Sequence, residues 1–133
     1  MHTTTIEASD PNALVMLMRK VVVRDPFSRS HRRAVHELRA VHPGLDEAAR
    51  RYRALGLRLA VRVGARDRYD VVVLHGDGFQ VADPMRPCAV ATIDKTAGTV
   101  TFHPEVDADV YRQACRRLHA VPERADASGN VAA

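Results

Sequence analysis

"GLRLAVRV", residues 56–63, decides the fold, because the spacing of the apolar residues changes within this stretch. Before Gly56 the apolar residues recur about every 3.6 positions, which is the period of a helix. From Leu57 to Val63 they occupy every second position. That period is typical of a strand with one buried face, and glycine suits the C-terminal cap of a helix. The stretch therefore predicts that helices end and a sheet begins at Gly56.

Three helices are expected on the N-terminal side of this boundary. Asp10-Pro11 suits a helix start, with aspartate as the cap and proline in the first turn, and predicts a helix over residues 10–23. The segment "MRKVVV" (18–23) also suits a strand, and both interpretations stay open. A second helix is expected over residues 28–41 and a third over residues 45–55.

A series of strands is expected after the helices. Beyond residue 63 we expect strands at 69–74, 79–82, 88–94 and 99–102. Short turns such as "HGDG" (75–78) join them, so neighbouring strands should be antiparallel. A last helix should begin near Asp107 and end before Pro122. Because helices and strands are segregated, the predicted fold class is α+β: N-terminal helices, an antiparallel four- or five-stranded meander sheet, and a C-terminal helix packed on the sheet.

The length of 133 residues corresponds to one domain. We expect a flexible N-terminus over residues 1–9, a single α+β domain over 10–121 and a disordered tail over 122–133.

No apolar run approaches the roughly 18 residues of a membrane helix, and the first ten residues lack the features of a secretory signal. The expected location is therefore cytoplasmic, with no membrane partner.

The formal net charge of +4 is unevenly distributed along the chain. Residues 19–68 contain 14 Lys and Arg against 5 Asp and Glu, a net charge of +9, whereas the remaining residues have a net charge of −5. Such an asymmetry steers anionic partners toward the first half. The abundance of arginine, alanine and valine is also typical of bacteria with GC-rich genomes, in which arginine fills ordinary surface positions.

The second expected helix carries its basic residues on one face. At helical spacing the solvent side gathers Arg29, Arg32, Arg33, His36 and Arg39. His31 and His42 fall on the side that faces the core. We therefore predict an anion-binding surface on this helix. Where the fold brings them near, it would be extended by Arg19, Lys20, Arg24, Arg58 and Arg62. The alternative is a solvated helix face without a partner.

The third expected helix has acids at its start and arginines at its end, the distribution that the helix dipole favours. Asp46 stands four residues before Arg50, and Glu47 stands four residues before Arg51. An acid four residues ahead of a base is the favourable order, so we expect two ion pairs within this helix. Only Arg53 is left without such a partner.

These features predict a small non-enzymatic binding protein whose basic helix contacts an anionic partner, first of all nucleic-acid phosphates. The turn at 42–45 suits a helix-turn-helix motif, but Arg50 and Arg53 stand where that motif needs apolar anchors. The alternative is a protein-interaction module, or a homo-oligomer, that pairs the basic half with an acidic half. The acids of the second half are Asp70, Asp77, Asp83, Asp94, Glu105, Asp107 and Asp109.

A small enzyme or metal protein is the third hypothesis, and we assign no catalytic residue, metal ligand or cofactor. His75 and His103 each stand two residues before a carboxylate at the end of an expected strand, so they form a site only if those ends meet. Phosphate-loop, nucleophile-elbow and zinc-protease motifs are missing from the sequence. Cys88 and Cys115 form no metal-binding pair, and both are expected to be free thiols.

Overall fold

The computed structural model describes residues 4–7, 16, 28–64, 67–82 and 88–118. The elements are β1 (Thr4–Glu7), α2 (Arg29–Val41), α3 (Pro43–Ala54), β2 (Arg58–Val63), β3 (Arg68–Leu74), β4 (Ala91–Asp94), β5 (Thr99–Phe102) and α4 (Pro104–Arg117). The helix predicted over 10–23, and its alternative strand at 18–23, lie outside the described residues except for Met16, which is helical. The tail predicted over 122–133 lies outside them as well.

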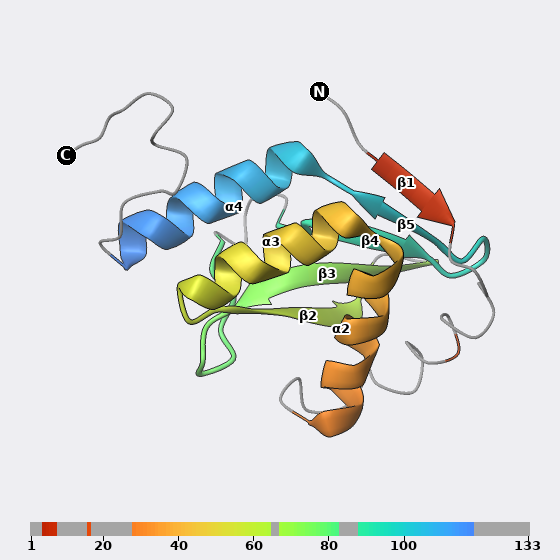
Figure 1. Ribbon diagram of the computed structural model, residues 1–133, viewed down its shortest axis with the longest axis horizontal. Helices are drawn as coiled ribbons and strands as arrows, with labels where there is room; N and C mark the ends of the chain where they lie inside the picture. Colours follow the sequence, from red (N-terminus) through yellow and green to blue (C-terminus); the bar gives the residue numbers. More distant parts are fainter. Residues whose placement is uncertain (1–3, 8–15, 17–27, 65–66, 83–87, 119–133) are drawn as a thin grey trace.

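All five strands form one antiparallel sheet in the order β1-β5-β4-β3-β2 (Figure 1). The four strands that follow the helices pair consecutively, which confirms the predicted α+β fold with a meander sheet. The period of two in residues 56–63 has the expected result. Leu59 and Val61 belong to the main core, whereas Ala60 lies on the opposite face of the sheet.

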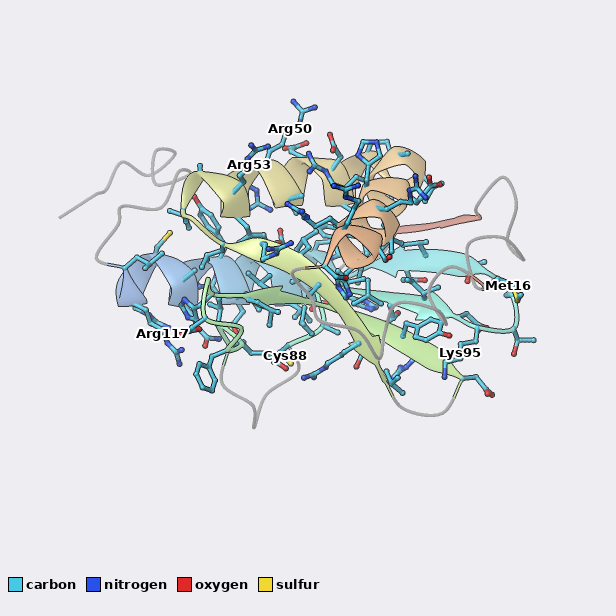
Figure 2. All side chains as sticks on the ribbon, turned by 90° about the horizontal axis from the view of Figure 1, so that it is seen from below. Met16, Arg50, Arg53, Cys88, Lys95 and Arg117 are labelled. Atoms are coloured by element: carbon cyan, nitrogen blue, oxygen red, sulfur yellow. The ribbon has the colours of Figure 1, made fainter. Side chains whose placement is uncertain are left out.

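The helices α2, α3 and α4 cover one face of the sheet and close the core (Figure 1). Each contributes fully buried side chains, among them Leu38 from α2, Tyr52 from α3 and Ala114 from α4. They pack against the inward residues of the strands, which include Val71 and Ile93. Cys88 lies on the other side of the molecule from Arg50 and Arg53 (Figure 2). Within the described residues no helix has the length and apolar character needed to cross a membrane.

The helix ends follow from local chemistry. The hydroxyl of Ser28 accepts a hydrogen bond of 3.2 Å from the backbone N–H of His31 and caps α2. Gly56 has a φ of 77°, the left-handed conformation that ends α3 as predicted. Pro43 and Pro104 stand in the first turns of α3 and α4. These helices therefore begin two or three residues earlier than expected, since proline is favourable in a first turn.

The segment Thr4–Glu7 corrects one prediction. It lies within residues 1–9, which we expected to be flexible, and it forms β1 by pairing antiparallel with β5. The β-branched residues threonine and isoleucine favour an extended backbone. Because β5 is far from β1 in the sequence, no local sequence pattern predicts that the two strands pair.

The predicted strand at residues 79–82 was also wrong. Gln80 makes an isolated bridge with Leu74, and the N–H of Val81 donates to the carbonyl of Val73 at 3.0 Å. The turn at Gly78, with a φ of 93°, brings the chain back as expected, but pairing ends after this short contact. Phe79 is 72% exposed and does not pack against the sheet.

Candidate anion-binding site

The elements α2, α3 and β2 surround one space on three sides, because they meet at three fixed corners. At the first corner the Nδ1 of His42 accepts from the N–H of Leu45 at 3.3 Å, which caps α3 directly after α2. At the second, the N–H of Leu57 donates to the carbonyl of Tyr52 at 2.9 Å. At the third, the Nε2 of His31 accepts from the N–H of Val61 at 3.0 Å, which ties α2 to β2.

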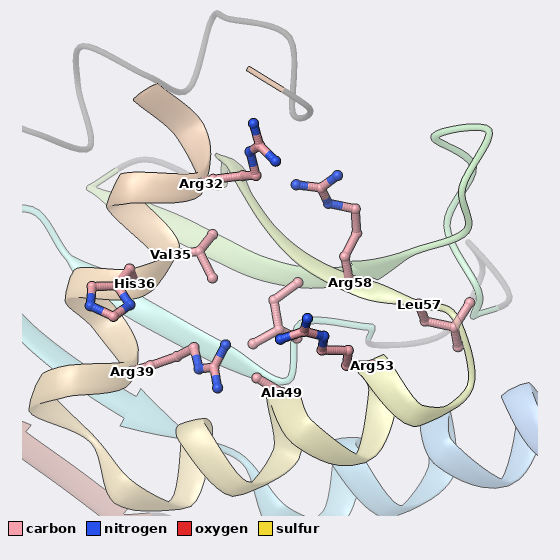
Figure 3. Close-up of a pocket in the computed structure, with 9 residues that line it drawn as sticks. Arg32, Val35, His36, Arg39, Ala49, Arg53, Leu57 and Arg58 are labelled. Carbon is pink, nitrogen blue, oxygen red and sulfur yellow. The ribbon is translucent and has the colours of Figure 1, made fainter. Parts of the chain in front are cut away.

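Between these corners lies a cavity of about 400 Å³, which we call the arginine cup (Figure 3). It is lined by Arg32, Val35, His36, Arg39, Ala49, Arg53, Leu57, Arg58 and Leu59. Four arginines and one histidine thus come from three different elements, and four apolar side chains complete the walls. No carboxylate is among the described residues that line the cup.

The guanidinium groups converge on the cup instead of spreading outward. In Figure 3, Arg32 on α2 and Arg58 on β2 point toward one another across its mouth, and Arg39 and Arg53 reach inward from α2 and α3. Like charges brought together in this way repel one another unless an anion or a solvent shell lies between them. The arrangement therefore favours the entry of a negatively charged group.

Arg39 has a partner within the chain, which corrects its place in the predicted open basic surface. Its Nε donates to Asp46 at 2.7 Å, and Arg50 donates to the same carboxylate at 3.1 Å. The hydrogen bond from Arg39 is the main cause that lowers the pKa of Asp46. Arg50 is the predicted partner of Asp46, but Arg39 stands on another helix. Only the turn at His42 brings it near, so helical spacing could not reveal this contact.

The remaining four residues of the predicted surface are exposed but divide between two places. Arg32 and His36 line the cup, whereas Arg29 and Arg33 do not, and we call this second pair the outer arginines. In the described part of the chain, none of these three arginines has an ion-pair partner.

Two of the cup's arginines come from outside the predicted helix. Arg53 is the residue of α3 that helical pairing left without an acid, and Arg58 was expected only as an extension of the surface. The sequence therefore indicates that Arg53 is available to a ligand, because no acid stands four residues before it. Arg62, also expected as an extension, instead contacts Gln80 and Cys88. Arg19, Lys20 and Arg24 lie outside the described residues.

Arg51 makes a different kind of site, which we call the α3–α4 junction. It forms an ion pair with Asp107 on α4 and not with Glu47, its predicted partner. The hydroxyl of Tyr52 donates to the same carboxylate at 2.6 Å, and the guanidinium of Arg51 lies 4.9 Å from the ring centre of Tyr111. Burial, with Asp107 beside it, raises the pKa of Tyr52. In the junction Arg51 therefore holds α3 and α4 together, and its guanidinium is already bound to a carboxylate.

His75 and His103 do not share a site. The N–H of His103 donates to the carbonyl of Val90, and the N–H of Val90 donates to the carbonyl of Val71. His103 and Val71 therefore lie at the same height along the strand direction. His75 directly follows the last residue of β3 and stands four residues beyond Val71, about 13 Å in the strand direction alone. His103 lies 3.1 Å from the hydroxyl of Thr92, and burial followed by the charge of Arg68 lowers its pKa. In the described residues no group of three or more metal-binding side chains occurs.

Several acids of the second half already have partners within the chain. Asp107 belongs to the α3–α4 junction, and Asp109 pairs with Arg112 at 3.4 Å. Asp77 and Asp94 accept backbone N–H groups in their own turns. These carboxylates serve the fold, which weakens the hypothesis of an acidic half that pairs with a basic one. Asp83 lies outside the described residues.

Both cysteines are free thiols. Cys115 is buried, and Cys88 accepts from the amide of Gln80 at 3.0 Å.

Comparison of the chain with protein-family models, curated proteins and solved structures finds no match. The arginine cup is therefore the feature from which a function can be inferred.

Proposed function

We propose that the protein binds an anionic partner, nucleic-acid phosphates, through the arginine cup and the outer arginines Arg29 and Arg33. The observation that carries this proposal is the convergence of four arginines from three elements on one cavity whose described lining holds no carboxylate. A solvated helix face would not need arginines from α3 and β2 to point into the same space as those of α2 (Figure 3).

The chemistry of the lining favours phosphate contacts over base recognition. Arginine presents a planar fork of donors that matches phosphate oxygens, and it stays charged at any working pH. No Phe, Tyr or Trp is among the described residues of the cup, so it lacks the large aromatic rings on which successive bases usually stack. Binding through phosphates alone is independent of sequence and weakens steeply with salt, because each neutralised phosphate releases counterions.

The test is the binding of fluorescently labelled single-stranded and duplex DNA and RNA, measured by anisotropy at about 50 and 200 mM salt. We expect weak binding without sequence preference that falls steeply between the two salt concentrations. Changing Arg29, Arg32 and Arg33 together to Gln should abolish it, since these exposed arginines make no ion pair within the described chain.

The matched control removes three arginines of α4. Arg112, Arg116 and Arg117 are exposed, and Arg117 lies on the far side of the molecule from Arg50 and Arg53 (Figure 2). Their change to Gln lowers the net charge equally but should leave most of the binding intact. Absence of binding at low salt, or an equal loss in both triple variants, contradicts the proposed surface.

A further inference from the structure

We propose that the arginine cup takes a terminal phosphate monoester, either at the end of a nucleic-acid strand or on a free small organic phosphate. This inference rests on the proposed anion binding and specifies which phosphate enters the cup. Three observations carry it: the three-sided outline of the cavity, the number of guanidinium groups around it, and the outer edge of β2 in its wall.

The outline of the cup suits an end and not a continuous chain. The corners at His31, His42 and Gly56 close the space between α2, α3 and β2 on three sides. A strand that continues in both directions can cross the mouth of such a cavity but cannot fill it. A volume of about 400 Å³ is that of a small-molecule site, enough for a phosphate and the sugar that bears it.

The charge of the cup matches a monoester better than an internal diester. A phosphate monoester carries about −1.5 to −2 charges near neutral pH and three terminal oxygens, whereas a diester carries one charge and two such oxygens. Arg32 and Arg53 reach the cavity from different helices without an acid partner among the described residues, and Arg39 and Arg58 complete the ring. Several forked donors around one space can bind three oxygens at once.

The backbone of β2 adds a donor to the same space. Among the described strands β2 lies at the edge of the sheet, and the N–H of Val61 points away from β3, since it donates to His31. In an antiparallel strand every second residue directs its N–H and C=O to the same side. The N–H of Leu59, two residues earlier, therefore points to the same outer edge, and Leu59 lines the cup. A backbone N–H beside guanidinium groups is a common element of phosphate sites.

The apolar walls indicate what the phosphate is attached to. Val35, Ala49, Leu57 and Leu59 offer no hydrogen-bonding side chain, so they suit the carbon skeleton of an ester such as a sugar phosphate. The experiment therefore compares labelled oligonucleotides of about twelve nucleotides that differ only in a 5′-phosphate, a 3′-phosphate or hydroxyl ends. Ribose 5-phosphate and inorganic phosphate are titrated separately and as competitors.

Two double variants with equal charge loss separate the cup from the outer face. Arg32→Gln with Arg53→Gln empties the cup of two arginines, and Arg29→Gln with Arg33→Gln removes the outer arginines. We expect a phosphate-ended strand to bind about tenfold more tightly than its hydroxyl-ended twin. The cup variant, Arg32→Gln with Arg53→Gln, should abolish that preference. The outer variant, Arg29→Gln with Arg33→Gln, should weaken the binding of both strands equally and keep the preference. Thermal unfolding of each variant confirms that it is folded.

The outcomes distinguish this inference from the proposed function. If ribose 5-phosphate binds, and loses binding only in the cup variant, while no oligonucleotide binds, the inference stands with a free organic phosphate as its source and the nucleic-acid proposal fails. If strands bind equally whatever their ends, and neither small phosphate competes, the inference is overturned and the nucleic-acid proposal stands. If no probe binds at low salt, both are overturned.

Discussion

The arginine cup and the α3–α4 junction both use arginines of α3, and they use them in opposite ways. Arg51 and Arg53 are two positions apart, so their side chains leave the helix about 200° apart. Arg51 meets Asp107, Tyr52 and Tyr111 and becomes part of the packing between helices. Arg53 faces a cavity whose described lining contains no acid. An arginine stabilises the fold where a carboxylate meets it and is available to a ligand where none does.

Removing the carboxylate of the α3–α4 junction should lower stability more than any other change considered. Asp107→Asn leaves the guanidinium of Arg51 without its counter-charge and weakens the hydrogen bond from Tyr52, so we expect a loss of about 2–4 kcal/mol in the free energy of unfolding. Urea denaturation followed by circular dichroism measures it. Phosphate binding by the folded fraction should not change, because Asp107 does not line the cup.

Glu105→Gln is the matched control for this change. It removes one carboxylate from the same helix, but Glu105 is exposed and only stands in the first turn. Its effect should stay below about 1 kcal/mol, the usual size of a helix-dipole interaction. Similar losses in the two variants would show that the junction is no more than a surface ion pair.

The second effect opens a corner of the cup. His31 is only 1% exposed and its Nε2 accepts the N–H of Val61, so His31→Ala leaves a buried donor without this acceptor and creates a cavity. We expect a loss of about 1–3 kcal/mol in unfolding free energy, together with weaker phosphate binding. His36→Ala, on the exposed side of the same helix, should change stability by less than about 0.5 kcal/mol. Equal stability of the two variants would contradict the structural role of this corner.

The comparison also shows what the sequence can and cannot predict. The spacing of apolar residues along the chain was enough to place α2, α3, the meander and the buried positions of His31 and His42, because these depend on local spacing. The pairing of β1 with β5 and the ion pair between Arg51 and Asp107 depend on segments far apart in the chain. No local pattern encodes them.

The candidate site was predictable in part for the same reason. Arg32 and His36 follow from the amphipathic pattern of α2, and Arg53 follows from the absence of an acid at helical spacing. The contribution of Arg58 and the pairing of Arg39 with Asp46 appear only when the three elements are placed around one cavity. A helical pattern identifies a basic face, but it does not show whether that face surrounds a hollow.

A smaller effect is expected when Arg39 loses its carboxylate partner and so comes to resemble Arg53. Asp46→Asn removes the carboxylate that holds Arg39 and Arg50, so the cup gains an arginine without a counter-charge. We expect phosphate affinity to rise about twofold to fivefold, the size typical of one exposed ion pair. Isothermal titration with ribose 5-phosphate measures the change. Unchanged or weaker binding would show that Asp46 positions Arg39 for the ligand instead of competing with it.

The smallest effect is the pH dependence of the same contact. Arg39 lowers the pKa of Asp46 from its usual value near 3.8, so the unfolded chain binds this proton at a higher pH than the folded chain does. The stabilisation is therefore complete above about pH 4 and is lost as pH falls through the lowered pKa of the folded state. A double-mutant cycle of Arg39→Gln and Asp46→Asn, measured by urea denaturation, isolates it. The coupling should be present at pH 6 and smaller at pH 3, whereas a coupling that does not depend on pH would mean that the two side chains interact by packing and not by charge.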